Sequence, residues 1–302
     1  MSTRDTVTVR VPAKVNVQLA VGAARPDGFH DLANVFLAVS LYDEVTVTRA
    51  DALTVTCSGP DAAQVPLDRT NLAARAAELL AARHGLSPDV HIHIAKDIPV
   101  AGGMAGGSAD GAGALLACDA LWGLGSSREE LLEICAELGS DVPFSLIGGA
   151  ALGTGRGEVL TPVEAGTFHW VFAVADGGLS TPAVFREFDR LTAATAVPAP
   201  QADPALLAAL RSGDPDALAA TLANDLQPAA LSLRPQLADT LAAGTGAGAL
   251  AALVSGSGPT TAFLVRDEET AAKVAAALTA STTCRTTRTT TSPAPGATVL
   301  AR

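Results

Sequence analysis

The sequence predicts an α+β fold that divides into two domains, residues 1–165 and 166–302. Three observations support this division. A chain of 302 residues is long for one compact core. Its first part combines valine-rich segments typical of strands with alanine-rich segments typical of helices. Beyond about residue 165, strand and helix patterns alternate as they do in a small α+β sandwich.

Alternating apolar residues predict several strands in the first domain. The expected strands cover residues 7–11, 15–21, 45–47, 53–57 and 90–94. An alanine- and leucine-rich stretch predicts a helix over residues 71–84. Ser127 and Glu130 have the spacing of a capping box, which predicts a helix that ends at Gly139. Asp141 then follows a helix end, where its side chain can face a cleft.

The second domain begins with a predicted strand over 169–175 and a helix over 181–191, followed by a proline-punctuated loop at 196–204. The next expected segments are helices at 204–211 and 215–223, the apolar segment 247–254, a strand at 260–265, a helix at 268–280 and a strand near 284–291. The last strand is unusually rich in threonine and arginine. We interpret it as a solvated edge strand.

A glycine-rich loop lies between a strand and a run of small apolar residues that predicts a buried helix (KDIPVAGGMAGGSADGAGALL, residues 96–116). Four glycines of the loop carry no Cβ: Gly102, Gly103, Gly106 and Gly107. A ligand can therefore approach the backbone closely, and successive N–H groups can turn toward one anion. Ser108 is expected to cap the helix, whose N-terminus adds unpaired N–H donors. The loop predicts a phosphate site, although glycine clusters are more often flexible turns.

The spacing of the loop does not fit two common nucleotide motifs. A GxxxxGK[ST] loop requires a lysine after its last glycine, where this chain has Ser108. The dinucleotide pattern GxGxxG is interrupted by Met104. Walker-type ATPases and Rossmann dehydrogenases are therefore disfavoured.

Composition and charge exclude further classes of function. With 48% apolar and 17% charged residues, the chain is typical of a soluble globular protein. Its net charge of −11 argues against a nucleic-acid partner, so an anionic substrate must be held by a few placed cations and backbone N–H groups. No apolar run approaches the roughly 20 residues of a membrane span, and residues 1–10 lack a signal-peptide core. We therefore expect a cytoplasmic protein.

Cysteines and histidines give no sign of a metal site. Four scattered cysteines contain no CxxC pair, and we interpret them as buried free thiols in a reducing compartment: Cys57, Cys118, Cys135 and Cys284. His91 and His93 lie two apart on a strand and so share one face. No third ligand is evident, so exposed polar positions are the better interpretation.

Four segments together resemble the GHMP small-molecule kinases. They are VPAKVNVQLAVGAARPDGFHDL (11–32), PVAGGMAGGSA (99–109), LGSDVPFSLIGGAALGTGRGEVL (138–160) and VSGSGPTTAFLV (254–265). They span nearly the whole chain in the family's order, and the DGFH and GSDVPF elements are similar to those of the branch that phosphorylates a cytidine-diphosphate-linked methylerythritol. The resemblance implies an N-terminal domain like domain 2 of ribosomal protein S5, a ferredoxin-like C-terminal domain and an active site between them.

The resemblance also implies an activity, the ATP-dependent phosphorylation of the 2-hydroxyl of that cytidine diphosphate substrate in the non-mevalonate isoprenoid pathway. Asp141 is similar to the family's catalytic aspartate, which can take the proton of the acceptor hydroxyl. Lys14 matches a lysine that keeps this carboxylate ionised and stabilises charge on the transferring group. Without the resemblance, both residues would be interpreted as ordinary exposed side chains.

The nucleotide site follows from the same resemblance. Lys96 and Asn71 are similar to residues that line the nucleotide pocket, although a surface lysine and a helix N-cap are alternatives. The other expected ATP-binding residues are Pro99, Gly102, Gly103, Met104, Ala105, Gly106, Gly107 and Ser108. Mg²⁺ is expected to arrive with ATP and to take few protein ligands. The Ser108 hydroxyl is a candidate ligand.

The acceptor site is expected around two aromatic residues. Phe29 and His30 resemble the tyrosine and histidine beside the cytosine of the substrate, and Phe185 resembles an aromatic residue on its opposite side. Phenylalanine keeps the stacking but lacks the phenolic hydroxyl, so base specificity rests more on His30. Core packing of the two phenylalanines is the alternative. The expected substrate-binding set also contains Asn16, Thr181 and Asp141.

Two other functions stay open. The chain can be a GHMP kinase for mevalonate, homoserine or a sugar, which the DGFH and GSDVPF elements disfavour. It can also be a GHMP-fold protein that binds a ligand without catalysis, which the presence of both Lys14 and Asp141 disfavours. For the protein itself we expect a monomer or a weak homodimer.

Overall fold

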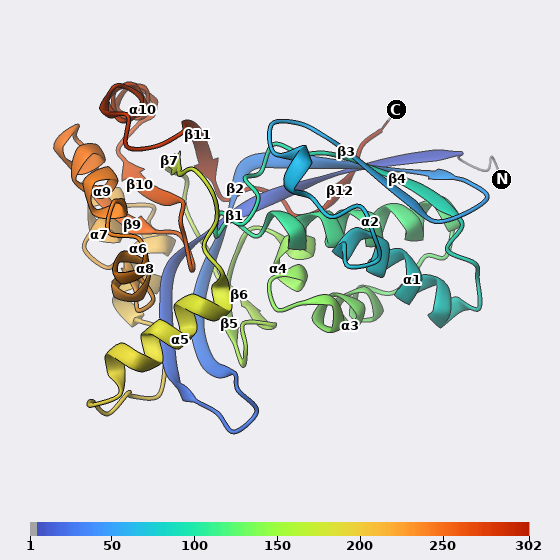
Figure 1. Ribbon diagram of the computed structural model, residues 1–302, viewed down its shortest axis with the longest axis horizontal. Helices are drawn as coiled ribbons and strands as arrows, with labels where there is room; N and C mark the ends of the chain where they lie inside the picture. The colour runs from blue at the N-terminus through green and yellow to red at the C-terminus, as the bar shows by residue number, and fades with distance from the viewer. Residues whose placement is uncertain (1–4, 302) are drawn as a thin grey trace.

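The computed structural model describes residues 5–301, which form two β-sheets with helices packed against them (Figure 1). Residues 1–4, part of the segment predicted to lack a signal-peptide core, lie outside the described residues. Within residues 5–301, no helix is both long and apolar enough to span a bilayer.

The first sheet is built on a long antiparallel hairpin, β1 (Thr6–Ala24) and β2 (His30–Arg49). The two strands predicted at 7–11 and 15–21 are one strand, because the pairing with β2 continues through irregularities between Pro12 and Ala13 and between Asn16 and Gln18. The hairpin extends beyond the sheet in Figure 1, and its far end packs against the first helix of the second domain.

Other strands complete this sheet in the order β12-β1-β2-β4-β3, with β5 joining β2 and β6, and β8 joining β1. Their bounds are β3 (Thr54–Ser58), β4 (Val90–Ala95), β5 (Ala150–Thr154), β6 (Val159–Pro162), β8 (Ala223–Asn224) and β12 (Thr298–Val299). Because β8 and β12 lie beyond residue 166 in the chain, later segments return to the first sheet. The domain boundary near residue 165 stays a prediction.

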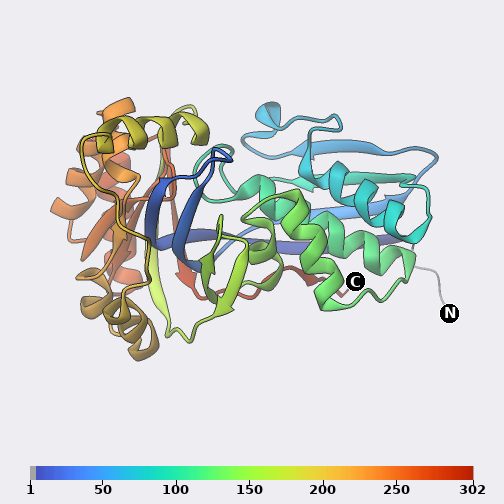
Figure 2. The same cartoon turned by 90° about the horizontal axis from the view of Figure 1, so that it is seen from below.

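Four helices cover one face of the first sheet, as the view from below shows (Figure 2). They are α1 (Leu72–His84), α2 (Gly106–Trp122), α3 (Arg128–Leu138) and α4 (Val142–Ile147), and the short helix η1 (Ala62–Gln64) precedes them. Helix α2 lies so close to the sheet that a Cβ on Gly113 would come within 2.8 Å of Val11 and Val45. Its small residues therefore allow the buried packing that the sequence predicts.

Capping side chains set the starts of two of these helices as predicted. The Asn71 side chain accepts from Ala73 N at 2.8 Å at the start of α1. The Ser127 hydroxyl accepts from Glu130 N at 3.1 Å at the start of α3, which ends at Gly139. Both contacts satisfy backbone donors that a helix end leaves unpaired.

The second sheet is antiparallel, with the order β11-β7-β10-β9. Its strands are β7 (Phe168–Val174), β9 (Ala251–Val254), β10 (Thr261–Val265) and β11 (Thr286–Ser292). Strand order and the helix between β10 and β11 give the ferredoxin-like arrangement that the resemblance implies. The surrounding helices are α5 (Thr181–Thr192), α6 (Pro204–Ser212), α7 (Pro215–Ala219), α8 (Gln227–Leu233), α9 (Leu237–Gly246) and α10 (Glu268–Ser281).

Three predictions for this part need correction. Helix α7 ends at Ala219 and not at 223, because the chain turns there into β8. Helices α8 and α9 were not predicted. The strand predicted near 284–291, β11, is an edge strand of the second sheet, but it is not simply solvated: Thr290 and Ser292 are buried, and Ser292 Oγ accepts from Trp170 Nε1 at 2.9 Å.

The cysteine prediction holds in part. All four are free thiols, and Cys118 and Cys135 are buried, whereas Cys57 and Cys284 are half-buried. Burial raises the pKa of the Cys118 thiol and raises that of Cys135 to about 12. His91 and His93 share hydrogen bonds to the Thr56 hydroxyl, and within residues 5–301 no cluster of three metal-ligating residues occurs.

Candidate active site

Lys14 lies at the centre of the candidate site, on β1. Its side chain is 6% exposed, and its ammonium donates to Asn16 Oδ1 at 2.5 Å and to the carbonyl of Gly103 at 2.9 Å. Asn16 in turn donates to Asn34 Oδ1 on β2 at 2.7 Å. Lys14 and Asn16 share a face of β1 because they are two residues apart. The lysine is therefore fixed between the hairpin and the glycine loop.

Asp141 faces this ammonium from the other side. Its Oδ2 lies 3.7 Å from Lys14 Nζ, and its side chain is 31% exposed. Asp141 precedes α4 at the N-cap position but makes no capping hydrogen bond, so its carboxylate is available to a substrate. Burial lowers the pKa of Lys14, and the charge of Asp141 opposes that shift. A buried cation beside a reachable carboxylate is suited to activating a hydroxyl.

The glycine loop approaches the pair through residues that allow no side chain. Gly103 has φ +78°, and a Cβ there would come within 2.0 Å of the carbonyl of Ser255. Gly102 and Gly106 are similarly confined, by Thr260 and by Lys96. Gly107 differs, since nothing lies within 4 Å of a Cβ built on it. The three confined glycines therefore pack tightly against neighbouring residues, while Gly107 faces open space.

Helix α2 begins earlier than the sequence predicts. Ala105, in the left-handed region with φ 60°, occupies the N-cap position without a side-chain hydrogen bond, and Ser108 is the third residue of the helix. The prediction that Ser108 caps α2 was therefore wrong, because the turn at Ala105 starts the helix three residues sooner. The first N–H groups of α2, including those of Gly106, Gly107 and Ser108, are the unpaired donors of a helix N-terminus.

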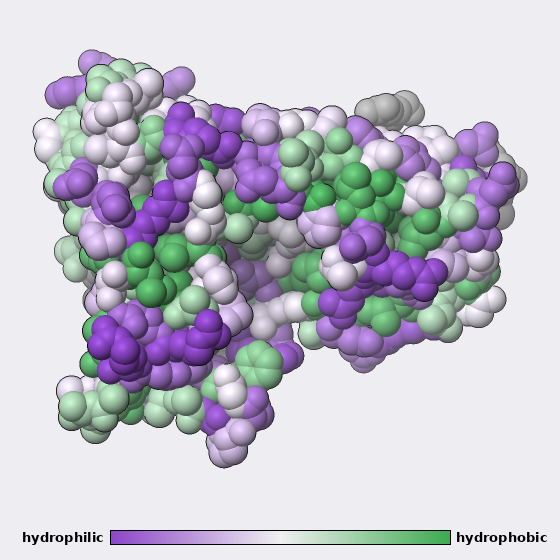
Figure 3. Space-filling view, viewed as in Figure 1, coloured by the Kyte–Doolittle hydropathy of each residue, from purple (hydrophilic) through white to green (hydrophobic). Residues whose placement is uncertain are grey.

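The third glycine-rich segment, between β9 and β10, supports this loop from behind. Ser255 Oγ donates to the carbonyl of Gly103 at 3.1 Å, and Thr260 N donates to the carbonyl of Gly102 at 3.2 Å. The Asn224 amide donates to the carbonyls of Val254 and Gly256. The second domain thus fixes the position of the loop, and the space-filling view is hollowed between the two parts (Figure 3).

Lys96 does not lie on the surface. Its ammonium donates to Asp43 Oδ2 at 2.5 Å and to Asp110 Oδ2 at 2.8 Å, and all three side chains are buried. Asp43 Oδ1 also accepts from the backbone N–H groups of Asp97 and Ile98, whereas Asp110 Oδ1 has no partner among the described residues. Burial raises the pKa of Asp110 to about 8. The network anchors the segment leading into the glycine loop.

Asn71 also has a local role in the structure. Besides capping α1, its amide nitrogen donates to the carbonyl of Pro66 at 2.7 Å. The alternative weighed from the sequence, a helix N-cap, is confirmed. Contact of Asn71 or Lys96 with a nucleotide stays a prediction.

A cavity of about 260 Å³ adjoins the start of the glycine loop. Its lining includes Ile98, Pro99, Asp61, Asp97, Arg285 and Arg288. Two ion pairs across it join β11 and the residue before it to the first domain. Arg285 contacts both oxygens of Asp61, at 2.5 and 2.8 Å, and Arg288 Nη2 lies 3.0 Å from Asp97 Oδ1.

The acceptor side lies where the β1–β2 hairpin meets α5. His30 Nε2 lies 2.9 Å from Asp189 Oδ1, and the His30 ring packs on Phe185 with centroids 4.9 Å apart. A base cannot lie between these two rings. Phe29 is 50% exposed at the hairpin end, and no contact between its ring and that of Phe185 occurs among the described residues. Thr181 Oγ1, at the start of α5, lies 2.9 Å from Ser257 Oγ.

Comparison with known families agrees with this geometry. The model of the GHMP kinases N-terminal domain matches residues 71–149, which include the glycine loop and Asp141, and the model of the GHMP kinases C-terminal domain matches residues 206–282. The chain belongs to the GHMP kinases. A curated relative from Streptomyces avermitilis, named 4-diphosphocytidyl-2-C-methyl-D-erythritol kinase, is 78% identical over 97% of this chain and 99% of its own length.

Further relatives of this GHMP kinase carry the same name. The protein from Streptomyces coelicolor is 77% identical over 97% of this chain and 99% of its own, and that from Thermobifida fusca is 61% identical over 99% and 100%. A crystal structure of 4-(cytidine 5'-diphospho)-2C-methyl-D-erythritol kinase is 31% identical, with TM-score 0.76 over 95% of this chain and 99% of its own.

Structural likeness by itself does not distinguish the substrates of GHMP kinases. The crystal structure of homoserine kinase from Cytophaga hutchinsonii has TM-score 0.77 over 99% of both chains, but it is 20% identical. It shares the fold with this chain. The information that separates acceptors therefore resides in the side chains of the acceptor site.

Several residues of this GHMP kinase site were not predicted from the sequence. Asn34 positions Asn16, Asn224 and Ser255 hold the loops, and Asp43 holds Lys96. Asn34 carries a detectable signal, since it is a lone amide in an apolar strand. Asp43 carries none, because its partner is 53 residues away.

Proposed function

We propose that this GHMP kinase transfers the γ-phosphoryl group of ATP to the 2-hydroxyl of 4-diphosphocytidyl-2-C-methyl-D-erythritol. The Lys14–Asp141 pair beside the glycine loop carries the proposal of phosphoryl transfer. The choice of acceptor is supported by relatives of that name at 77 and 78% identity over nearly the full length of both chains. A cytoplasmic location and a monomeric or weakly dimeric state stay predictions.

Asp141 is the proposed general base. Its carboxylate reaches solvent, and it accepts the proton of the acceptor hydroxyl as the oxygen attacks phosphorus. Lys14 acts from the buried side, where its ammonium stabilises the negative charge that develops on the transferring group. Because Asn16 and the Gly103 carbonyl hold this ammonium, little reorganisation is needed at the moment of transfer.

The phosphates of ATP are proposed to bind at the N-terminus of α2. The N–H groups of Gly106, Gly107 and Ser108 have no earlier turn of the helix to pair with, and the positive end of the helix dipole lies at the same place. Gly107 leaves room for close approach. The 260 Å³ cavity beside Ile98 and Pro99 is then the proposed place for the adenine base.

Mg²⁺ is proposed to bind with the nucleotide. The residues present fit such a role, because the half-buried Ser108 hydroxyl makes no hydrogen bond among the described residues and offers the hard oxygen ligand that Mg²⁺ prefers. When bound, the ion would neutralise phosphate charge.

The product of the reaction tests this function. Purified protein incubated with ATP and the cytidine substrate should yield one new phosphomonoester signal in ³¹P NMR, coupled to the carbon skeleton at position 2. The Asp141→Asn variant is the control for contaminating kinases. ADP release without a new phosphomonoester would show hydrolysis of ATP and contradict the proposal.

A further inference from the structure

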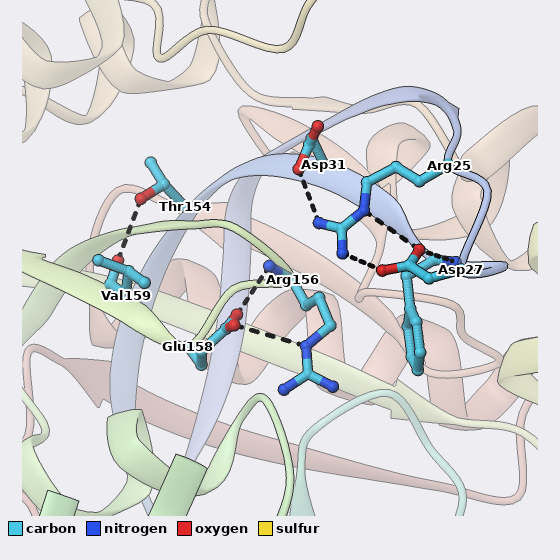
Figure 4. A network of polar contacts seen from close by, with 8 residues as sticks. Arg25, Asp27, Asp31, Thr154, Arg156, Glu158 and Val159 are labelled. Carbon is cyan, nitrogen blue, oxygen red and sulfur yellow. Dashed lines mark hydrogen bonds and ion pairs between the residues drawn. The ribbon is translucent and has the colours of Figure 1, made fainter. Parts of the chain in front are cut away.

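Arg156 lies in the turn between β5 and β6, next to the hairpin strand that leads from the acceptor site to the catalytic pair. Leu32 N on β2 donates to the carbonyl of Gly155 at 2.8 Å, which fixes the turn at the level of Leu32. Glu158 holds Arg156 from within the turn, accepting from its backbone N–H at 2.7 Å and from its Nε at 3.4 Å (Figure 4).

The Arg156 guanidinium has N–H donors that are not paired with any described residue. Its side chain is 36% exposed, and its two terminal nitrogens make no hydrogen bond among the described residues. Its Cζ lies 5.1 Å from the centroid of the Phe29 ring, so the cation rests on the aromatic face. Arg25, the other arginine of this area, is instead held by the carboxylates of Asp27 and Asp31, as Figure 4 also shows.

The place of this turn along β2 matters for an extended substrate. His30 lies at the base side of the proposed acceptor site, and Asn34 is linked through Asn16 to Lys14. Leu32 lies midway between them, about 7 Å from each at the usual rise of a strand. A cytidine diphosphate ester with its base near His30 and its hydroxyl at Asp141 passes its two phosphates at this level.

We propose that Arg156 binds the diphosphate of the acceptor substrate through its terminal nitrogens while its guanidinium face supports Phe29. This inference rests on the proposed function. In a chain of net charge −11, such a dianion needs a placed cation, and the planar fork of arginine matches phosphate oxygens. Glu158 orients the fork by binding Nε and leaves the two terminal nitrogens to the ligand.

Calorimetric titration with CDP and with cytidine tests the assignment, because the two ligands differ in the diphosphate alone. The donor site is first saturated with a non-hydrolysable ATP analogue. Arg156→Ala should weaken CDP binding about 10- to 100-fold, the range for a hydrogen bond to a charged group, and leave cytidine binding nearly unchanged. Arg156→Lys should recover part of the loss. Arg211→Ala, an exposed arginine with a single Nε contact to Glu164, is the matched control.

Two other outcomes would contradict the inference. Equal losses for CDP and cytidine would show that Arg156 acts through Phe29 alone, and unchanged CDP binding in a folded Arg156→Ala protein would remove it from the site. In both cases the proposed function would survive, since the unmodified protein binds CDP. If the unmodified protein bound neither ligand, the inference and the proposed acceptor would fall together.

Discussion

Lys14 and Asp141 face each other with their charged groups 3.7 Å apart, but one is buried and the other reaches solvent. The lysine is held by the hairpin and by the glycine loop, whereas the aspartate stands at the start of α4 without a capping role. This asymmetry assigns their roles. The reachable carboxylate meets the acceptor, and the buried ammonium stays in place through the reaction.

Removing the carboxylate should stop catalysis and spare binding. Asp141→Asn keeps the shape of the side chain, so we expect kcat to fall by roughly 10² to 10⁴, the usual scale for general acid–base catalysis, with KM values changed little. Lys14→Ala should be similarly damaging. Steady-state kinetics with both substrates varied measure this. Near-normal kcat in Asp141→Asn at saturating substrates would leave Asp141 a positioning role at most.

The interaction between Asp141 and Lys14 should also affect the pKa of Lys14. Burial holds the pKa of Lys14 below its ordinary value of 10.5, and Asp141 opposes the shift, so Asp141→Asn should lower this pKa further. Between the lowered pKa and 10.5 the folded chain binds fewer protons than the unfolded one, so Lys14 makes stability rise with pH there.

This titration is accessible by NMR because the chain has three lysines, Lys14, Lys96 and Lys273. Spectra of protein labelled with ¹³C at lysine Cε should contain three signals, of which exposed Lys273 is the internal reference. A Lys14 signal that titrates at the same pH in the wild-type protein and in Asp141→Asn would show that the two groups are not coupled.

Two glycines of the loop should respond in opposite ways to substitution. Gly103→Ala puts a Cβ onto the Ser255 carbonyl at φ +78°, so the protein should lose stability. A Cβ on Gly107 meets nothing outside its own helix within 4 Å, so Gly107→Val should keep its melting temperature within a few degrees while losing ATP affinity. Thermal unfolding and ATP titration separate the two effects. Intact ATP binding in Gly107→Val would place the phosphates elsewhere.

Phe185 tests the cytosine site. Base stacking on an aromatic ring is worth roughly 1 to 3 kcal/mol, so Phe185→Ala should raise KM for the cytidine substrate by about one to two decades. KM for ATP should change little, because the proposed adenine cavity is lined by other residues. Phe29→Tyr, which introduces the tyrosine that Phe29 resembles in the family, should be tolerated. Equal changes in both KM values would remove Phe185 from the base site.

Local sequence signals predicted much of the fold. The starts of α1 and α3 depend on Asn71 and Ser127, whose caps reach two or three residues ahead. The two-domain α+β architecture and its ferredoxin-like second sheet also follow from the sequence, because strand periodicity and four family motifs agree. The start of α2 was missed because it depends on a left-handed turn at Ala105, a residue type that seldom adopts one.

Contacts between segments that are far apart in the chain could not be predicted from the sequence. From the sequence, a surface position was the alternative considered for Lys96. Its burial depends on Asp43 and Asp110, which the first sheet and α2 place beside it. The arginine-rich segment around β11 was expected to be solvated. Instead, Arg285 pairs with Asp61 and Arg288 pairs with Asp97, because β11 packs beside the first domain. Helices α8 and α9 lie in an alanine-rich region whose apolar pattern has no clear period.

The identity of the acceptor is tested by comparing four candidate acceptors side by side. Purified protein is given ATP with 4-diphosphocytidyl-2-C-methyl-D-erythritol, mevalonate, homoserine or galactose, and kcat/KM is measured for each. We expect turnover of the cytidine substrate at a kcat/KM at least about 10³-fold above the others, since they cannot fill the base and diphosphate sites. Comparable or faster turnover of mevalonate, homoserine or galactose would contradict it.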